Sequence, residues 1–526
     1  MLLQGTLAHD KIRKLALFGV SLTLSFAGFA QSQPAPSPDE KLAPVPTTWR
    51  LTNETWKLPA GETLGMVGGN LLFDVSDQVK LGVGSYGAMR GQRGGFITLG
   101  LAAELNQKIT DQWSAETGLF VGGGGGRGSG ALAGGGLMLR SHAGLSYDTQ
   151  GFGKFGLGVS HVRFPSGTIQ STQPYLLYDY TFTSLFANGW RHAPSVTQPA
   201  LDILESKQQE FSPVYRHYSI PGSVVQDNGA AQHRSIQLTG VEWLSYLDDR
   251  WFLKLESEGA MGGKSNGYMQ ILVGAGYRLP LGPGTAVKMH VAAGPAGGGS
   301  VDTGGGLLLD GGIALQQKIS RSKSLELSLG HVRSPSASFK ANSVALKLSH
   351  HFGIPSADND VSWISLASFE PQALRMRIVN QTYLKGSPNW RNSYVDQSVN
   401  NLGVQLDYFL PGSNNATRVF ATGQGLAAYA GNAGAYMTGL IGAGVQTSLG
   451  THWFAEAEGL VGAAGGGGLA VGGGLVGQAN AGLGYRLTKS LSVMGTAGYM
   501  AAKGGEFKAK VLGVSLAYQF TGFAQK

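Results

Sequence analysis

The sequence predicts an all-β fold, an antiparallel transmembrane β-barrel built from three internal repeats of about eight strands each. Three observations predict it. Segments of about 9–12 residues alternate between apolar and polar side chains, which is the length and period of a tilted membrane strand. A glycine-triplet motif recurs at a nearly constant interval. The composition is rich in glycine, 83 of 526 residues, and poor in charge, 14% Asp, Glu, Lys and Arg.

Alternation is clearest in the segment WFLKLESE, where Trp251, Leu253 and Leu255 share one face of the expected strand and Lys254 and Glu256 share the other. The segments SLELSLG, SVALKLSHHF and GVSLAYQF repeat this pattern. Turn residues such as Gly, Asn, Asp and Ser separate the segments. We therefore expect on the order of 24 strands in the whole chain.

The repeats are marked by a Gly-Gly-Gly-Leu motif. Its glycines are Gly134–Gly136, Gly304–Gly306 and Gly472–Gly474, so the copies lie 170 and 168 residues apart. The segments that end YLLYDYTF, ALKLSHHF and VSLAYQF are separated by the same two intervals. A looser third marker is the set RLTNETW, YRHYSI and RIVNQTY near the start of each copy. Together these markers indicate a triplicated unit.

The repeats and the segments between them give the expected organisation of the chain. The predicted parts are a signal peptide 1–30, a Pro-rich linker 31–46, unit 1 at 47–182, a linker 183–209, unit 2 at 210–352, a linker 353–372, unit 3 at 373–520, and a tail 521–526.

The N-terminus has the parts of a cleaved secretory signal. Lys11, Arg13 and Lys14 precede an apolar stretch, and the small residues Gly28 and Ala30 precede a cleavage point before residue 31. The alternative is a buried N-terminal helix. Cysteine is absent, which suits an oxidising envelope compartment and excludes disulfides and thiolate metal sites.

An uncharged stretch at 459–485 is long enough for a transmembrane helix. Ten glycines within 459–477 disfavour a helix there by ~10 kcal/mol relative to alanine. A close-packed pair of glycine-rich helices is the alternative, but alternation on both sides favours a glycine-rich β-hairpin.

The last strand of the pattern, KVLGVSLAYQF, resembles the C-terminal insertion signal of Gram-negative outer-membrane β-barrels. Gly513, Leu516, Tyr518 and Phe520 carry the resemblance, although Phe520 is not terminal and residues 521–526 follow it. The resemblance implies a place in the outer membrane, contact with its lipid, and insertion by the barrel-assembly machinery. The alternative is an array of soluble periplasmic β-sandwiches.

Two architectures fit a triplicated barrel protein. One large barrel of about 24 strands is favoured here, because the inward faces mix Gly, Ala, Ser and charge rather than bulky filling. Three eight-stranded barrels in tandem are the alternative, and the long linkers favour it because turns on the periplasmic side of a barrel are usually short.

Motifs for catalysis are weak, so the chain is not expected to be an enzyme. The string Gly263–Gly267 matches G-x-S-x-G, but it joins two alternating strands and is read as a hairpin turn. The pairs Glu256/Glu258 and Glu456/Glu458 have a spacing near that of inverting glycosidases, yet such charges commonly line a wet barrel. No cofactor and no metal are expected. The charge of +8 forms no basic block, so nucleic acid is not an expected partner.

The expected function is an outer-membrane channel or export pore for small solutes or an extracellular polymer. A non-transporting structural or adhesive barrel is the alternative, and a barrel enzyme is a third. An open interior would favour transport and a packed one would favour structure. The candidate lumen-lining residues are Lys254, Glu256, Glu258, Lys288, His290, Glu326, Lys347, Glu456 and Glu458.

Overall fold

The computed structural model describes residues 42–187, 205–356, 369–392, 396–410 and 416–525. The predicted signal peptide lies outside these residues, as do the central parts of both linkers and most of the Pro-rich linker. Among the described residues, no helix is long and apolar enough to cross a membrane. The described chain is all-β and antiparallel, as predicted.

The strands form three closed barrels of eight strands each. The expectation of one large barrel is therefore wrong, and the tandem alternative is correct. The physical reason is register. The first strand of each unit pairs along its length with the last strand of the same unit, so each sheet closes on itself. One β-bridge, Thr521 to Ala187, joins the sheets of barrels 1 and 3.

Barrel 1 consists of β1 (Leu42–Lys57), β2 (Thr63–Asp74), β3 (Val79–Arg90), β4 (Ile97–Lys108), β5 (Trp113–Gly125), β6 (Met138–Asp148), β7 (Lys154–Arg163) and β8 (Gln170–Ala187). A short helix, α2 (Ser129–Leu132), lies between β5 and β6.

Barrel 2 consists of β9 (Glu205–Ser219), β10 (Ser235–Tyr246), β11 (Trp251–Gly262), β12 (Met269–Gly282), β13 (Thr285–Gly297), β14 (Leu307–Lys318), β15 (Lys323–Arg333) and β16 (Lys340–Ser356).

Barrel 3 consists of β17 (Phe369–Lys385), β18 (Val399–Phe409), β19 (Thr417–Ala430), β20 (Met437–Ser448), β21 (Trp453–Gly465), β22 (Leu475–Arg486), β23 (Leu491–Ala502) and β24 (Lys508–Gln525). The predicted glycine-rich hairpin is β21–β22.

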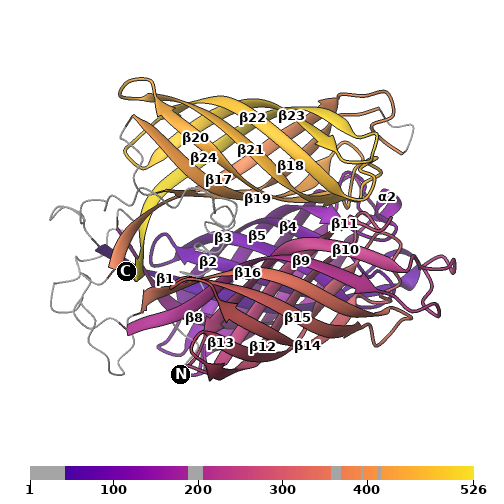
Figure 1. The fold of residues 1–526 in the computed structure, drawn as a ribbon, viewed down its shortest axis with the longest axis horizontal. Coiled ribbons are helices and arrows are strands. Elements are labelled where there is room, and N and C mark those ends of the chain that lie inside the picture. The colour runs from indigo at the N-terminus through magenta and orange to yellow at the C-terminus, as the bar shows by residue number, and fades with distance from the viewer. Residues whose placement is uncertain (1–41, 188–204, 357–368, 393–395, 411–415, 526) are drawn as a thin grey trace.

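The three barrels pack side by side in a ring, with their first strands beginning and their last strands ending at one shared end (Figure 1). We call this the terminal end and the opposite end the loop end. The third strand of each barrel packs against the fifth strand of another: β3 against β13, β11 against β21, and β19 against β5. Because every barrel uses the same two strands in the same roles, the arrangement has a pseudo-threefold axis.

The glycine triplets form the seams of this ring. A Cβ on Gly135 would lie 3.0 Å from Cα of Ala430, and one on Gly305 would lie 2.8 Å from Cα of Arg90. One on Gly473 would lie 3.2 Å from Cα of Gly262. Each triplet thus touches the same position of the neighbouring barrel. The three motifs occupy equivalent places, as their spacing predicts, and glycine is needed there because two backbones approach closely.

The terminal half of the axis is filled by apolar side chains from all three barrels, which we call the axial core. Phe182 and Phe186 come from barrel 1, Trp243 from barrel 2, and Leu374 and Phe520 from barrel 3, and all five are buried. The ring is therefore held by an apolar core at the terminal end and by glycine seams at the loop end.

Candidate functional site

The interior of barrel 1 is crossed by an ion-pair network centred on Arg50 of β1. Its guanidinium contacts Asp179 of the adjacent β8 at 2.6 Å, Glu116 of β5 at 2.8 Å and Glu104 of β4 at 3.1 Å. In an eight-stranded barrel β5 lies opposite β1, so Arg50 reaches across the lumen. A second pair, Arg140 with Glu54 at 3.0 Å, lies beside it.

Barrel 2 carries the densest network. Lys288 of β13 contacts Glu210 on the opposite strand β9 at 2.6 Å and Glu326 of β15 at 2.7 Å. Lys347 of β16 contacts the same Glu326 at 2.8 Å and Glu242 of β10 at 2.8 Å. These four contacts connect five of the eight strands, β9, β10, β13, β15 and β16.

A second part of this network lies between the same walls. Lys254 contacts Glu242 at 3.1 Å and Glu256 at 2.9 Å. Arg216 contacts Glu256 at 2.6 Å and Glu258 at 2.9 Å. The guanidinium therefore binds both carboxylates of the Glu256/Glu258 pair, which holds them as partners of a cation rather than as a free acid–base pair.

Barrel 3 repeats this arrangement with arginines. Arg375 and Arg377 of β17 both contact Asp407 of β18 at 2.7 Å. Across the lumen on β21, Arg377 donates to Glu458 at 3.2 Å and Arg375 pairs with Glu456. Each of the three barrels thus has at least one arginine on its first strand that binds carboxylates of other strands inside the barrel.

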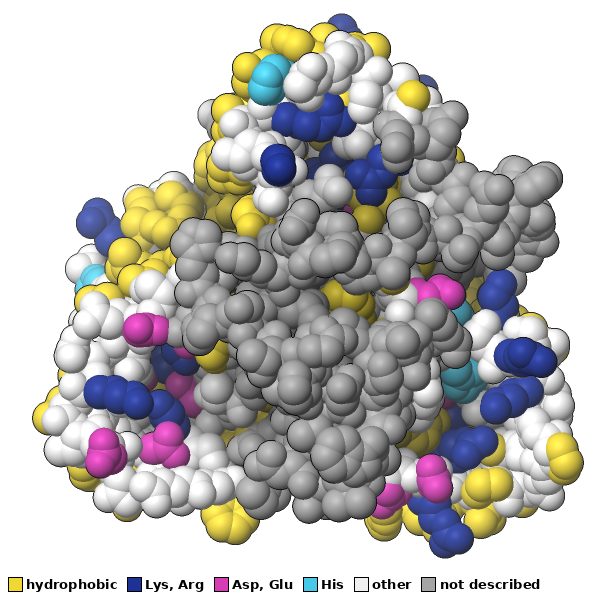
Figure 2. All heavy atoms as spheres, turned by 90° about the vertical axis from the view of Figure 1, so that its left-hand side faces the viewer, with side chains coloured by type: hydrophobic (Ala, Val, Ile, Leu, Met, Phe, Trp, Pro, Cys, Tyr) yellow, Lys and Arg dark blue, Asp and Glu magenta, His cyan; other side chains and the backbone are white. Residues whose placement is uncertain are grey.

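All nine residues that the sequence proposed as lumen-lining lie inside the barrels, and each side chain is at most 8% exposed. They are enclosed by partners: His290, for example, lies 2.8 Å from Asp310. Their role in lining a path for solutes stays a prediction. Charged side chains also gather in the barrel openings at the terminal end, as Figure 2 shows.

Sequence reasoning missed the cations that organise these networks, namely Arg50, Arg216, Arg375 and Arg377. A signal was present, because Arg50, Arg216 and Arg377 belong to the loosely repeated RLTNETW, YRHYSI and RIVNQTY segments. As a repeat marker, this set counts the units but does not place a side chain. Read with period two, it places Arg50, Thr52 and Glu54 on one strand face, and all three are buried.

The mouth of barrel 3 at the terminal end holds two arginines without a carboxylate contact among the described residues. Arg418 stacks on the ring of Phe409 at 3.8 Å, and Arg486 stacks on Phe454 at 5.0 Å and donates to Ser448 at 3.0 Å. Lys and Arg side chains are visible in the opening of this barrel, the upper lobe of Figure 2. The mouth is therefore electropositive.

The residues of the proposed insertion signal lie in β24. Leu516 is 45% exposed on the outer surface, Gly513 faces inward, and Phe520 is buried in the axial core. Phe520 therefore contacts side chains of the neighbouring barrels, Phe186 of barrel 1 among them. Its part in membrane insertion stays a prediction.

Other chemical sites are not evident in the part of the chain that the structure describes. It contains no group of three or more His, Cys, Asp or Glu side chains placed to hold a metal ion. Ser265 of the G-x-S-x-G string lies in the turn between β11 and β12, as the hairpin interpretation predicted.

No family model matches the sequence, and no curated protein matches it. Similar solved structures include a mutant of the ferric enterobactin receptor PfeA of Pseudomonas aeruginosa in complex with enterobactin, with 10% identity over 93% of this chain and 82% of that chain and a TM-score of 0.27. OpdQ of Pseudomonas aeruginosa has 9% identity over 92% and 98% of the two chains, with a TM-score of 0.20. OccAB3 of Acinetobacter baumannii has 11% identity over 92% and 100%, with a TM-score of 0.19. Scores this low do not bear on the arrangement of the barrels or on function.

Proposed function

We propose that this chain is an outer-membrane protein whose three barrels span the bilayer side by side. The outer strand faces support this. Large apolar side chains stand exposed on all three barrels, including Leu119, Leu157, Leu176, Val291, Leu327, Leu346, Leu483, Leu512 and Val514. An exposed apolar band of this kind is stable in lipid and unfavourable in water.

The two ends of the barrels support the same placement. At the terminal end of each barrel an exposed Trp packs against a half-buried Tyr, with ring centroids 5.1–5.2 Å apart: Trp113 with Tyr147, Trp251 with Tyr277 and Trp453 with Tyr485. Such rings mark a membrane interface. Connections at the terminal end are short, such as 109–112 and 283–284, whereas loop-end connections such as 126–137 and 220–234 are longer. Outer-membrane barrels have short turns on the periplasmic side, so the loop end faces outward in this proposal.

Within the membrane, we infer a structural role without transport through the barrels. The single observation that carries this is the ion-pair network across each lumen, because eight-stranded barrels are narrow enough for side chains to fill. In barrel 1 Arg50 touches three strands at distances of 2.6–3.1 Å, which leaves no wide path at that level. A filled interior favours the structural alternative over an open pore.

Two experiments test the proposal. Fractionation should recover the mature protein in outer membranes, with heat-modifiable migration on gels. Purified protein in planar lipid bilayers should give no discrete conductance steps across the usual voltage range. Stable steps from the wild-type protein would refute the closed-lumen proposal, and recovery as a soluble periplasmic protein would refute the membrane placement.

A channel for small solutes is the second candidate, and the mouth of barrel 3 is the observation that favours it. Arg418 and Arg486 face the opening without a described carboxylate contact and would attract anions. Passage would require the pair between Arg375 and Glu456 to separate. The same bilayer recordings under a salt gradient test this candidate, which requires anion-selective steps.

A further inference from the structure

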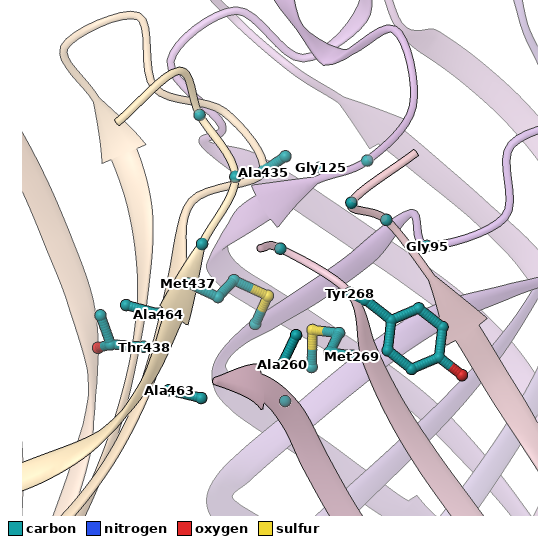
Figure 3. Close-up of a pocket in the computed structure, with 18 of the residues that line it drawn as sticks. Gly95, Gly125, Ala260, Tyr268, Met269, Ala435, Met437, Thr438, Ala463 and Ala464 are labelled. Carbon is teal, nitrogen blue, oxygen red and sulfur yellow. The ribbon is translucent and has the colours of Figure 1, made fainter. Parts of the chain in front are cut away.

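A cavity of about 840 Å³ lies between the barrels on the pseudo-threefold axis, in the loop-end half of the molecule (Figure 3). It is bounded by strands of all three barrels and lies outside every lumen. Its volume falls in the range of ligand pockets, about 300–1,000 Å³. The axial core fills the axis at the terminal end, so the cavity is a blind pocket.

The wall of the cavity is apolar. Val83 and Leu99 come from barrel 1, Met269 and Ile271 from barrel 2, and Met437 from barrel 3. Figure 3 shows Met269 and Met437 lying toward one another from two barrels. Methionine side chains adapt to ligands of varied shape.

The three charged residues of the lining are all paired with other charges. Among the described lining residues, Arg127 and Asp227 are charged, and they pair with each other at 3.4 Å in the loops. The third charged residue, Glu258, turns its carboxylate into barrel 2 toward Arg216. A wall without an available charge favours an uncharged, apolar molecule.

Barrel 3 makes room for that molecule. The paired residues Ser85 and Leu99 of barrel 1 correspond to Ser257 and Ile271 of barrel 2. The corresponding pair in barrel 3 is Gly425 and Gly439. A Cβ on Gly439 would meet no atom within 4 Å. The loss of both side chains in one copy widens the cavity, which a contact made only for packing would not need.

The cavity opens among the loops and is shut off from lipid. Arg127, Ser300 and Asn432, one from each barrel, are exposed loop residues of its lining. The glycine seams lie on the flanks, where Gly94 donates to the carbonyl of Gly304 at 2.8 Å and Gly434 donates to that of Gly134 at 3.0 Å. Access is therefore from the loop end.

We propose that this axial cavity binds one slender, apolar molecule, such as an acyl chain, that enters from the loop end. A site on the axis exists once per chain, so one ligand binds per protein. Entry from outside the cell rests on the proposed orientation in the membrane, whereas the site itself does not.

The test uses the full chain transferred into amphipol after delipidation, titrated with the apolar dye 1-N-phenylnaphthylamine. Wild-type protein should show saturable fluorescence with one dye bound per chain. Gly439→Leu fills the cavity and should abolish saturable binding. Gly495→Leu is the matched control, because a Cβ on this exposed β23 glycine also meets no atom within 4 Å, and it should bind as the wild type does.

Retention of wild-type affinity by folded Gly439→Leu would overturn the proposal. Met437→Trp fills the same space and replaces Gly439→Leu in the test if that variant does not fold. Displacement of the dye by the uncharged alcohol tetradecan-1-ol added in solution supports capture of a soluble apolar molecule. Displacement by phospholipid alone would overturn entry from the loop end. These binding assays are independent of conductance, so they can fail or succeed separately from the proposed function.

Discussion

Replacing Arg50 with alanine tests whether the ion-pair networks hold the barrels closed and folded. The variant removes a side chain that is 2% exposed and that makes a bidentate contact with Asp179, with N–O distances of 2.7 and 2.6 Å. It also leaves Glu104 and Glu116 without their guanidinium partner. Glu104 then keeps His142, whose Nε2 lies 3.0 Å away, and Glu116 keeps the hydroxyl of Tyr175, which donates to it at 3.2 Å.

The expected cost follows from the burial of these carboxylates. Removing one partner of a buried ion pair destabilises a protein by about 3–5 kcal/mol, because the remaining charge stays buried without compensation. Arg50 serves three carboxylates, so we expect the upper part of this range. Since about 1.4 kcal/mol is a factor of ten, local opening of barrel 1 should increase by roughly three to four orders of magnitude.

Hydrogen exchange with mass spectrometry, performed on the full chain in lipid vesicles, measures this opening barrel by barrel. Exchange should accelerate in peptides of β1, β4, β5 and β8, while barrels 2 and 3 serve as internal references. Arg50→Lys keeps the charge but loses the bidentate contact and should fall between the wild type and Arg50→Ala. Arg163→Ala, at an exposed position, should change little. A change of about 0.5 kcal/mol or less for Arg50→Ala, as for ordinary surface substitutions, would refute the reasoning.

Two further predictions concern the seams and barrel 2. Gly306→Ala should loosen the contact between barrels 2 and 1, because the new Cβ collides with the carbonyl of Ala88. Faster hydrogen exchange in the 91–96 loop would measure this loosening. The control is Gly504→Ala, which is also at positive φ but has no neighbouring atom within 4 Å of the new Cβ. Lys347→Glu should prevent barrel 2 from closing, since it adds a carboxylate beside Glu242 and Glu326. Loss of the heat-modifiable band on gels would measure the failure to close. Lys340→Glu, at an exposed position, should retain the band.

The strands and the triplication could be predicted because both depend on local pattern. In β16, Val344 and Leu346 are 44% and 49% exposed whereas Lys347 is 2% exposed. The alternation therefore correctly predicts which side chains lie on the outer face of the strand and which lie on the inner face. Closure could not be predicted in the same way. The alternation of β1 is compatible with β8 or with any other neighbour, and only the long-range register between Leu51 and Tyr178 decides between three barrels and one.

The interior was harder to predict than the fold. The apolar–polar alternation of the strands places Lys288 and Glu326 inside a barrel, but this alternation is the same for a water-filled lumen and for a closed one. What closes barrel 2 is the distance of 2.6 Å between Lys288 and Glu210, residues 78 positions apart on opposite strands. The axial cavity could not be predicted from the sequence for a related reason. In a glycine-rich chain, Gly425 and Gly439 are distinguished from the other glycines only by their pairing and by the position of barrel 3.

The ring gives a physical reason for three units rather than two. Each barrel presents its third strand to one neighbour and its fifth strand to the other, so the contact joins different surfaces. Contacts of this kind close only when the rotation between units completes a circle. Two units would leave one third-strand surface and one fifth-strand surface uncovered, with a glycine seam such as Gly304–Gly306 exposed to lipid. The third unit covers both surfaces, and by closing the ring it also creates the axial cavity, which no single barrel and no pair of barrels could enclose.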